Sequence, residues 1–294
     1  MTTSRAGAGI DAGGTTFKCG VTDQTGRLVA SRRVPVTDPP TTLLQCLRFF
    51  EEVRGAHPFE CFGIASFGPL DNDPTSPNYG TILETPKPGW TGTNLRQFFR
   101  DGLNLDVVVD TDVNGALLAE MNRGAAQNCQ TAAYITIGTG IGAGIWVNGH
   151  LAGRPSHPEF GHIPVQRHPD DMAFPGTCPF HGDCLEGVAS ATAIRARFGD
   201  PSELAVDSPA WLIIADYLAQ ACRTLTLTLR PERIVLGGGL MLAPHLLALI
   251  REQYFQQLGG YLGTTANTAE QLIVCPGLGD DAGLLGAIDL GLRA

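Results

Sequence analysis

The chain lacks the features of membrane, secreted and nucleic-acid-binding proteins. No apolar run approaches the roughly 20 residues that a helix needs to cross a bilayer. Residues 1–6 show no apolar stretch of the signal-peptide kind. Basic residues are scarce, with 20 lysines and arginines against 29 acidic residues, which gives a net charge of −9. We therefore expect a cytoplasmic protein with no nucleic-acid or membrane partner.

The chain also lacks the G-x-x-x-x-G-K-[ST] motif, which excludes a P-loop. Its 294 residues and 43% hydrophobic content suffice for one large domain or two medium ones. Six cysteines are scattered through apolar segments, and in a reducing compartment we expect them to be reduced core residues. They are Cys19, Cys46, Cys61, Cys129, Cys222 and Cys275.

Both halves of the chain open with the same pattern of strand, glycine–threonine turn, strand, turn and strand. The pattern predicts strands at 7–10, 16–22 and 27–36, and again at 132–137, 142–147 and 150–151, which indicates a weak internal duplication. Further strands are expected at 61–66, 106–110, 233–236 and 271–275. Helices are expected from 39 to about 53 and at 95–100, 114–122, 188–198, 211–229, 243–258 and 282–292.

Strands alternating with helices predict an α/β protein with two similar domains. We expect these domains at 1–115 and 116–294, with an insertion at about 156–187 and a terminal helix (282–294) packed back onto the first domain. Ligands of such folds bind beyond the carboxyl ends of strands. Asp11, Thr111–Asp112, Gly138–Thr139 and Gly237–Gly239 follow strands in this way, so we expect them to face one interdomain cleft.

A compact cluster of metal-binding residue types lies in the insertion. Cys178, His181 and Cys184 have the spacing C-x-x-H-x-x-C, and His162 lies upstream. Four such ligands complete a tetrahedral Cys₂His₂ site for a structural Zn²⁺. The alternative is a coincidence of two cysteines and two histidines.

The glycine–threonine turns are candidates for binding a polyphosphate. Glycine lets backbone N–H groups come close to phosphate, and threonine hydroxyls add donors. Ordinary hairpins also use these residues, but two matching turns favour a ligand site. The turn at Gly237–Gly239 either receives a nucleotide or is a tight connection from strand to helix. The candidates are Asp11, Gly13, Gly14, Thr15 and Thr16, then Gly138, Thr139 and Gly140, then Gly237, Gly238 and Gly239.

Four carboxylates are candidates for catalysis or binding. Asp112 is placed to accept a hydroxyl proton during phosphoryl transfer, or to cap a helix. Asp11 orients Mg²⁺ or forms an Asx-type turn. Glu159 and Glu186 flank the metal cluster and suit acid–base work or acceptance of sugar hydroxyl protons, of which we favour binding. Glu186 also suits the first turn of a helix.

Together these residues resemble a known family. The segments Asp11-Ala-Gly-Gly-Thr15, Asp112-Val-Asn-Gly, Ile137-Gly-Thr-Gly-Ile-Gly142, Glu159-Phe-Gly-His162 and Cys184-Leu-Glu186 resemble the ROK family of repressors and sugar kinases. Within it, four further segments are similar to bacterial fructokinases. They are Ile64-Ala-Ser-Phe-Gly-Pro69, Thr85-Pro-Lys-Pro-Gly-Trp90, Ser156-His-Pro-Glu159 and Cys178-Pro-Phe-His-Gly-Asp-Cys184.

The resemblance implies a two-domain actin-like ATPase fold with ATP and a sugar in the cleft. It implies Asp112 as the catalytic base, a sugar site of Glu159, His162, Glu186, Gly68 and Thr111, and Zn²⁺ on His162, Cys178, His181 and Cys184. The glycine–threonine turns would bind the ATP phosphates, with Gly237–Gly239 near adenosine, and members often form dimers. Two departures stand out: Thr16 replaces a common lysine at a phosphate contact, and Thr111 replaces a common asparagine at a sugar contact.

The hypothesis is an ATP- and Mg²⁺-dependent fructokinase that makes fructose 6-phosphate. One alternative is a kinase for mannose, glucose or an N-acetylhexosamine. A second is a repressor of the same family, which the ten residues before Asp11 and the acidic charge disfavour. A third is a sugar sensor without catalysis, which the presence of Asp112 and both turns disfavours.

Overall fold

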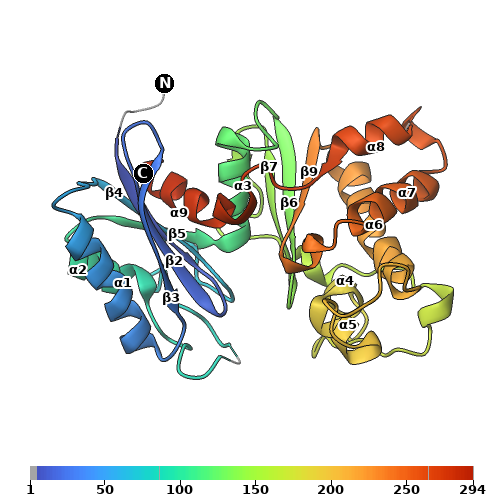
Figure 1. Ribbon diagram of the computed structural model, residues 1–294, viewed down its shortest axis with the longest axis horizontal. Coiled ribbons are helices and arrows are strands. Elements are labelled where there is room, and N and C mark those ends of the chain that lie inside the picture. Colours follow the sequence, from blue (N-terminus) through green and yellow to red (C-terminus); the bar gives the residue numbers. More distant parts are fainter. Residues whose placement is uncertain (1–4, 86, 264, 294) are drawn as a thin grey trace. The chain divides into compact units, whose positions relative to one another are not determined.

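The computed structural model describes residues 5–85, 87–263 and 265–293, and it divides into two compact units. Unit 1 comprises Met1–Asn122, Gly153–His157 and Leu278–Ala294, and unit 2 comprises Arg123–Ala152 and Pro158–Gly277. Each unit has a five-stranded sheet with helices and its own hydrophobic core (Figure 1). The expected α/β class with two similar halves is confirmed.

The sheet of unit 1 combines an antiparallel meander with two parallel strands. Its strands are β1 (Gly7–Ala12), β2 (Thr16–Thr22), β3 (Leu28–Pro35), β4 (Cys61–Ser66) and β5 (Val107–Thr111), in the order β3-β2-β1-β4-β5. Strands β4 and β5 run parallel to β1, with Ala12 paired to Ser66 and Ser66 paired to Thr111. The carboxyl ends of β1, β4 and β5 are therefore level, and the residues after them share one edge of the sheet.

The two faces of this sheet are covered differently. The apolar side chains of one face, among them Ile10, Phe62 and Ile64, form a core with α1 (Pro39–Val53) and α2 (Leu95–Leu103). The other face receives α9 (Ala282–Leu292), which packs on β1 and β4 (Figure 1). A Cβ on Gly63 would lie 1.9 Å from the carbonyl oxygen of Ala287. Glycine therefore lets this helix sit directly on the strand backbone.

Unit 2 repeats this topology. Its strands are β6 (Thr131–Ile137), β7 (Ile141–Val147), β8 (His150–Leu151), β9 (Arg233–Gly237) and β10 (Ile273–Val274), in the order β10-β9-β6-β7-β8. The meander β6-β7-β8 is antiparallel, and β9 and β10 are parallel to β6 and to each other. Read from the opposite edge, this order is that of unit 1, so the duplication predicted from the turn pattern is present in the topology.

Three predicted elements of unit 2 differ from the structure. The helix expected at 188–198 is two helices, α4 (Leu185–Ala189) and α5 (Ala191–Phe198), because the Ser190 hydroxyl accepts the Ala193 N–H at 3.2 Å and starts a new helix. The helix expected from 243 begins at α7 (Leu246–Leu258), after a 3₁₀ turn at Gly239–Leu242. The strand expected at 271–275 is confined to β10 (Ile273–Val274), because α8 (Ala266–Leu272), which a capping box of Thr265 and Thr268 starts, extends to Leu272.

The remaining helices agree more closely. Helix α6 (Ala210–Leu229) fills the core of unit 2, and α3 (Asp112–Arg123) follows β5 directly.

The boundary between the units differs from the one expected after residue 115. All of α3 as far as Asn122 belongs to unit 1, so a boundary after residue 115 would cut through this helix. In the described part of the chain, no helix is both long enough and apolar enough to cross a membrane.

Candidate functional site

The glycine turn of unit 1 connects β1 to β2. The Gly13 amide donates to the carbonyl oxygen of Thr16 at 3.2 Å and closes the turn. Gly14 and Thr15 are exposed. The Phe67 amide donates to the carbonyl of Ala12 at 2.9 Å, so the loop that contains Gly68 begins beside the turn.

Asp112 lies at the amino end of α3, on the edge where β1, β4 and β5 end. One of its carboxylate oxygens accepts the Val113 amide at 2.8 Å. The hydroxyl of Thr111 accepts the Asn114 amide at 3.3 Å, so a threonine contributes the capping contact that was the alternative role for Asp112. The aspartate is left at the helix terminus with an oxygen for other partners.

Burial raises the pKa of Asp112 to about 7, and the nearby charge of Asp11 contributes to the rise. Burial also raises the pKa of Asp11 to about 6, an effect that Lys18 opposes and Asp280 supports. The Lys18 ammonium lies 3.9 Å from the Asp11 carboxylate. Two interacting carboxylates whose pKa values lie near neutrality are typical of a site that accepts protons or binds a cation.

The sequence analysis did not predict a buried network of hydrogen bonds at Asp110, two residues before Asp112. The Asp110 side chain is fully buried and accepts from Asn114 at 2.8 Å and from Asn72 at 3.2 Å. It also forms an ion pair with Arg154. An aspartate at the end of an otherwise apolar strand was the available signal, because a buried carboxylate requires partners.

The glycine turn of unit 2 connects β6 to β7 and is held by neighbouring helices. The Ala191 amide donates to the carbonyl of Gly138 at 2.7 Å, and the Thr192 hydroxyl donates to the carbonyl of Thr139 at 2.8 Å. The Glu186 carboxylate accepts the Ile141 amide at 2.8 Å, and a Cβ on Gly140 would lie 2.6 Å from that carboxylate. Glu186 therefore lies in the first turn of α4 and also supports the glycine turn.

This turn opens into a pocket of about 590 Å³ that lies within unit 2. We call it the glycine-turn pocket. It is lined by Gly138, Thr139, Ala191, Arg195, Asp200, Pro201, Ser202, Leu204, Val206, Trp211, Gly239, Leu240, Leu242, Ala243, Pro244 and His245. Gly238, next to its wall, has φ +90°, and a Cβ there would lie 2.5 Å from the Ile137 backbone. The Trp211 and His245 rings pack edge to face at 4.8 Å, and both ring nitrogens of His245 are buried without a hydrogen-bond partner.

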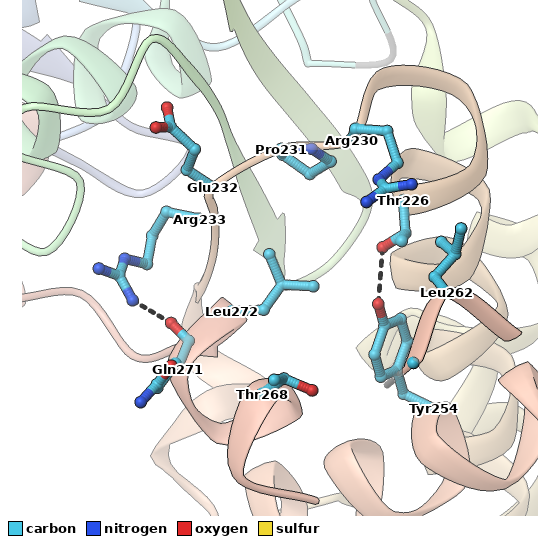
Figure 2. A pocket seen from close by; sticks show the side chains of 11 residues that line it. Thr226, Arg230, Pro231, Glu232, Arg233, Tyr254, Leu262, Thr268, Gln271 and Leu272 are labelled. Carbon is cyan, nitrogen blue, oxygen red and sulfur yellow. Dashed lines mark hydrogen bonds between the residues drawn. The ribbon is translucent and has the colours of Figure 1, made fainter. Parts of the chain in front are cut away.

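A second pocket, of about 370 Å³, lies elsewhere in unit 2 between α6, α8 and β9 (Figure 2). The Thr226 and Tyr254 hydroxyls share a hydrogen bond of 2.9 Å on its wall, and Arg233 donates to the carbonyl of Gln271. None of the residues singled out in the sequence lines it. It carries no part of the candidate site.

The predicted metal ligands come together in unit 2. The ligand atoms of His162, Cys178, His181 and Cys184 all lie within 4.8 Å of one another. The His162 Nδ1 atom is 3.5 Å from the Cys184 sulfur and 3.6 Å from the Cys178 sulfur, and His181 Nδ1 is 3.7 Å from the Cys178 sulfur. Ligands at ordinary Zn–S and Zn–N distances on a tetrahedron lie roughly 3.6 Å apart. The residues therefore fit a tetrahedral ion of the zinc type.

The electrostatics of the cluster also fit a cation. Burial raises the pKa of the Cys184 thiol to about 11, and the neighbouring Cys178 adds to the rise. A bound cation reverses this preference because it stabilises the thiolate. Glu159 immediately precedes the 3₁₀ turn Phe160–His162 and is exposed.

Comparison with known proteins places the chain in a family. The model of the ROK family matches residues 7–294. The chain belongs to the ROK family. It is 45% identical to the fructokinase of Zymomonas mobilis subsp. mobilis, over 97% of this chain and 96% of that protein.

Solved ROK structures share the fold. The ROK hexokinase of Thermus thermophilus is similar with a TM-score of 0.79 and 26% identity, over 98% of both chains. A ROK family glucokinase of Streptomyces griseus, in complex with glucose and AMPPNP, is similar with a TM-score of 0.75 and 26% identity, over 99% of both chains. The predicted relationship and the two-part fold of this family are thus confirmed.

The site residues predicted from the sequence are divided between the two units of this ROK protein. Unit 1 contains Asp11, the turn Gly13–Thr16, Gly68, Thr111 and Asp112, and unit 2 contains all the others. Beyond Asp110 and its partners, sequence reasoning missed most of the glycine-turn pocket, including Trp211 and His245. It also missed a role for Lys87, whose side chain contacts the unit 1 turn. Lys87 lies in the segment Thr85–Trp90 that resembles fructokinases, but the segment does not indicate its contact with the turn, and Trp211 and His245 carry no recognisable local motif.

Proposed function

We propose that this ROK protein is an ATP- and Mg²⁺-dependent hexose kinase that converts D-fructose to fructose 6-phosphate. The observation that carries the proposal is Asp112, a carboxylate with a pKa near 7 on the same sheet edge as a glycine turn. The similarity to a fructokinase along nearly the whole chain supports fructose as the substrate.

In the proposed reaction, Asp112 accepts the proton of the C6 hydroxyl as its oxygen bonds to the γ-phosphorus of ATP and the bond to ADP breaks. A carboxylate of pKa about 7 remains far less basic than an alkoxide, so proton transfer comes late and positioning supplies much of the rate. Asp11 is the residue we assign to Mg²⁺, directly or through water, and Mg²⁺ would neutralise charge on the phosphates.

We assign the nucleotide to the glycine-turn pocket, whose volume and apolar walls suit an adenosine. Gly138, Thr139 and Gly140 would face phosphates, and Gly237–Gly239 the nucleoside. The turn Gly13–Thr16 is the candidate for phosphate contacts in unit 1. The buried, unpartnered nitrogens of His245 offer hydrogen bonds to a polar base edge.

For the sugar we propose Gly68, Thr111, Glu159, His162 and Glu186. In the structure His162 presents Nδ1 to both thiols, which leaves Nε2 for a sugar hydroxyl. Glu186 has one carboxylate oxygen bonded to Ile141, and a carboxylate accepts further hydrogen bonds. A structural Zn²⁺ on His162, Cys178, His181 and Cys184 would thus hold a sugar-binding imidazole in place. As an ATP-dependent enzyme, the protein would work in the cytoplasm, where ATP is available.

The test is ADP release with MgATP and fructose, mannose, glucose or N-acetylmannosamine. We expect fructose to lead in kcat/KM by tenfold or more, about 1.4 kcal/mol in transition-state binding. Strong activity with a different preferred sugar would support the kinase function but change the proposed substrate. Similarity to a glucokinase solved with glucose makes glucose the first competitor. Inactivity with every hexose would contradict the proposal and favour a sugar sensor.

A further inference from the structure

The two lysines of this chain lie beside the same turn. The sequence contains 18 arginines but only Lys18 and Lys87 as lysines. Lys18 is on β2, shortly after the turn Gly13–Thr16, and Lys87 belongs to the loop between β4 and α2. The turn itself contains no basic side chain. An ammonium group is a compact point charge suited to phosphate, whereas arginine offers a planar fork.

The charge of Lys18 is already paired. Its ammonium group donates to the Asp280 carboxylate at 2.6 Å and to the Asp280 carbonyl at 2.7 Å. It also lies 3.9 Å from the Asp11 carboxylate. Lys18 therefore serves to hold these acidic groups beside the turn, and little of its charge is available to an anion.

The charge of Lys87 is not paired with any acid in the described part of the chain. Its ammonium group donates to the carbonyl of Gly14 and lies 4.2 Å from the ring centroid of Phe67 and 5.4 Å from that of Trp90. Burial lowers its pKa, with no contribution from a neighbouring charge. An ammonium has three donors, and the Gly14 carbonyl uses one of them.

The aromatic rings under Lys87, those of Phe67 and Trp90, are held by packing and by a hydrogen bond. Trp90 is fully buried, its indole N–H donates to the carbonyl of Thr37 at 3.1 Å, and its ring packs on Phe17 at 5.3 Å. The Phe67 ring packs edge to face on Trp90 at 5.8 Å. A cation is thereby held over a turn whose residues Gly14 and Thr15 are open to solvent. A Cβ at Gly14 would meet nothing within 4 Å, so the space beside the turn is free.

We propose that Lys87 binds the terminal phosphate of the nucleotide at the turn Gly13–Thr16 and stabilises the charge on that phosphate during transfer. This role rests on the proposed kinase function. The ammonium stays protonated throughout and exchanges the Gly14 carbonyl for phosphate oxygens. If Lys87 only stabilised the turn, its loss would weaken the binding of nucleotides with two phosphates and of those with three phosphates equally.

The first experiment uses the wild-type protein and an amine-acylating reagent, with labelling of each lysine read by mass spectrometry. We expect Lys87 to react faster than ion-paired Lys18 in the free protein. Mg–AMPPNP should protect Lys87 at least fivefold, and Mg–ADP and fructose alone should protect it much less. Equal protection by ADP, protection by fructose alone, or none at all would overturn the proposal. Lys18 is the internal control.

The second experiment compares Lys87→Met, which keeps the length and removes the charge, with Lys87→Arg, which keeps the charge. For Lys87→Met we expect kcat to fall about 100-fold, the size of effect seen when one charge-stabilising donor is lost. AMPPNP affinity should fall about tenfold and ADP affinity by less than twofold, and Lys87→Arg should recover part of both losses. Equal losses for AMPPNP and ADP would assign Lys87 to the structure of the turn.

These results separate the two proposals. An active wild-type kinase with an unprotected Lys87 would refute the role of Lys87 alone. If AMPPNP selectively protects Lys87 but the protein is inactive on every hexose, the kinase function is refuted and the binding of phosphate by Lys87 is supported. If Lys87→Met does not fold, the labelling of the wild-type protein still decides.

Discussion

The turns β1–β2 and β6–β7 occupy the same place in two units of the same topology, yet their surroundings differ. The turn of unit 1 is surrounded by charged side chains, with Lys18, Lys87, Asp11 and Asp280 in its vicinity. The turn of unit 2 is held by hydrogen bonds from Ala191 and Thr192, and it opens into a largely apolar pocket.

In the proposed function, the two turns of this duplicated topology serve different ends of the nucleotide. In unit 1, charged groups around an open turn suit the end of the nucleotide where charge develops. In unit 2, a firmly held turn beside apolar walls suits the nucleoside and its binding energy. Changes in unit 1 should therefore reduce kcat, and changes in unit 2 should raise KM for ATP or reduce stability.

The largest effect is expected from Asp112→Asn. General-base catalysis contributes about 10²- to 10⁴-fold, so kcat should fall by about that factor. Stability should not fall, because the carboxylate has a raised pKa in the folded state. Above pH 7 its charge costs folding free energy, and this cost disappears as the pH falls from about 7 towards 3.8. The neutral amide of the variant removes the cost, so at pH 8 the Tm should be unchanged or higher.

Asp106→Asn is the matched control in the same unit, because Asp106 is exposed, precedes β5 at the end opposite Asp112 and, among the described residues, accepts only from Arg96 and the Val107 amide. It should leave kcat within twofold. An Asp112→Asn protein that is folded and fully active would contradict the assignment of the base.

The features that the sequence predicted are formed by residues close together in the chain, and the features that it missed are formed by residues far apart. Local patterns predicted the bounds of β2, β4 and α9, because alternation and helical periodicity are written in adjacent residues. Cysteine and histidine spacing likewise predicted a cluster that the structure assembles. At 271–275 the hydrophobic run predicts a strand, but only Ile273–Val274 (β10) forms one, because the helix that the capping threonines start extends to Leu272.

The parts of the site that sequence reasoning missed depend on contacts distant along the chain. Lys87 meets Gly14 across 73 positions, and Arg154 meets Asp110 across 44. The lining of the glycine-turn pocket comes from segments between residues 138 and 245. A single segment can indicate that a residue such as Asp110 needs a partner, but it does not identify the partner, because only the folded chain brings the two together.

The next largest effect is expected at the metal cluster, which has no counterpart among the predicted groups of unit 1. Cys184→Ser should reduce bound zinc from about one ion per chain to a small fraction, because a closed site needs all four ligands. The Tm should fall by about 5 °C or more. Metal analysis and calorimetry measure both quantities.

Cys275→Ser is the control, since Cys275 is exposed and outside the cluster. It should retain zinc and Tm. Stoichiometric zinc in Cys184→Ser with unchanged stability would refute the ligand set.

A smaller effect should follow a change in the glycine-turn pocket. Leu242 lines it and is 84% exposed, so Leu242→Asp should not disturb the core. A carboxylate there repels the polyphosphate and removes apolar contact, and we expect KM for ATP to rise about tenfold, which corresponds to about 1.4 kcal/mol. KM for the sugar should stay within twofold.

Leu212→Asp is the matched change, because Leu212 is also exposed in unit 2 but does not line this pocket. Its KM for ATP should stay at the wild-type value. Equal effects of the two substitutions would remove the nucleotide from this pocket.

The smallest effect should appear in the pH dependence of Asp11→Asn. In the wild type, the base form of Asp112 is lost as the pH falls through about 7, so kcat/KM for the sugar should decline tenfold per pH unit below that value. The charge of Asp11 contributes to the raised pKa, and its removal lowers the pKa of Asp112. The acid limb should therefore move to lower pH.

The position of the limb, and not the height of the profile, is the quantity to compare. Loss of Asp11 weakens the proposed Mg²⁺ site and lowers activity at every pH, so each profile is scaled to its own plateau. The fraction of plateau activity that remains at pH 6 should be larger in Asp11→Asn than in the wild type, because the pKa of Asp112 is lower without the charge of Asp11. Two coupled carboxylates on one edge of unit 1 require this shift, whereas an unmoved limb would mean that a group other than Asp112 titrates in the reaction.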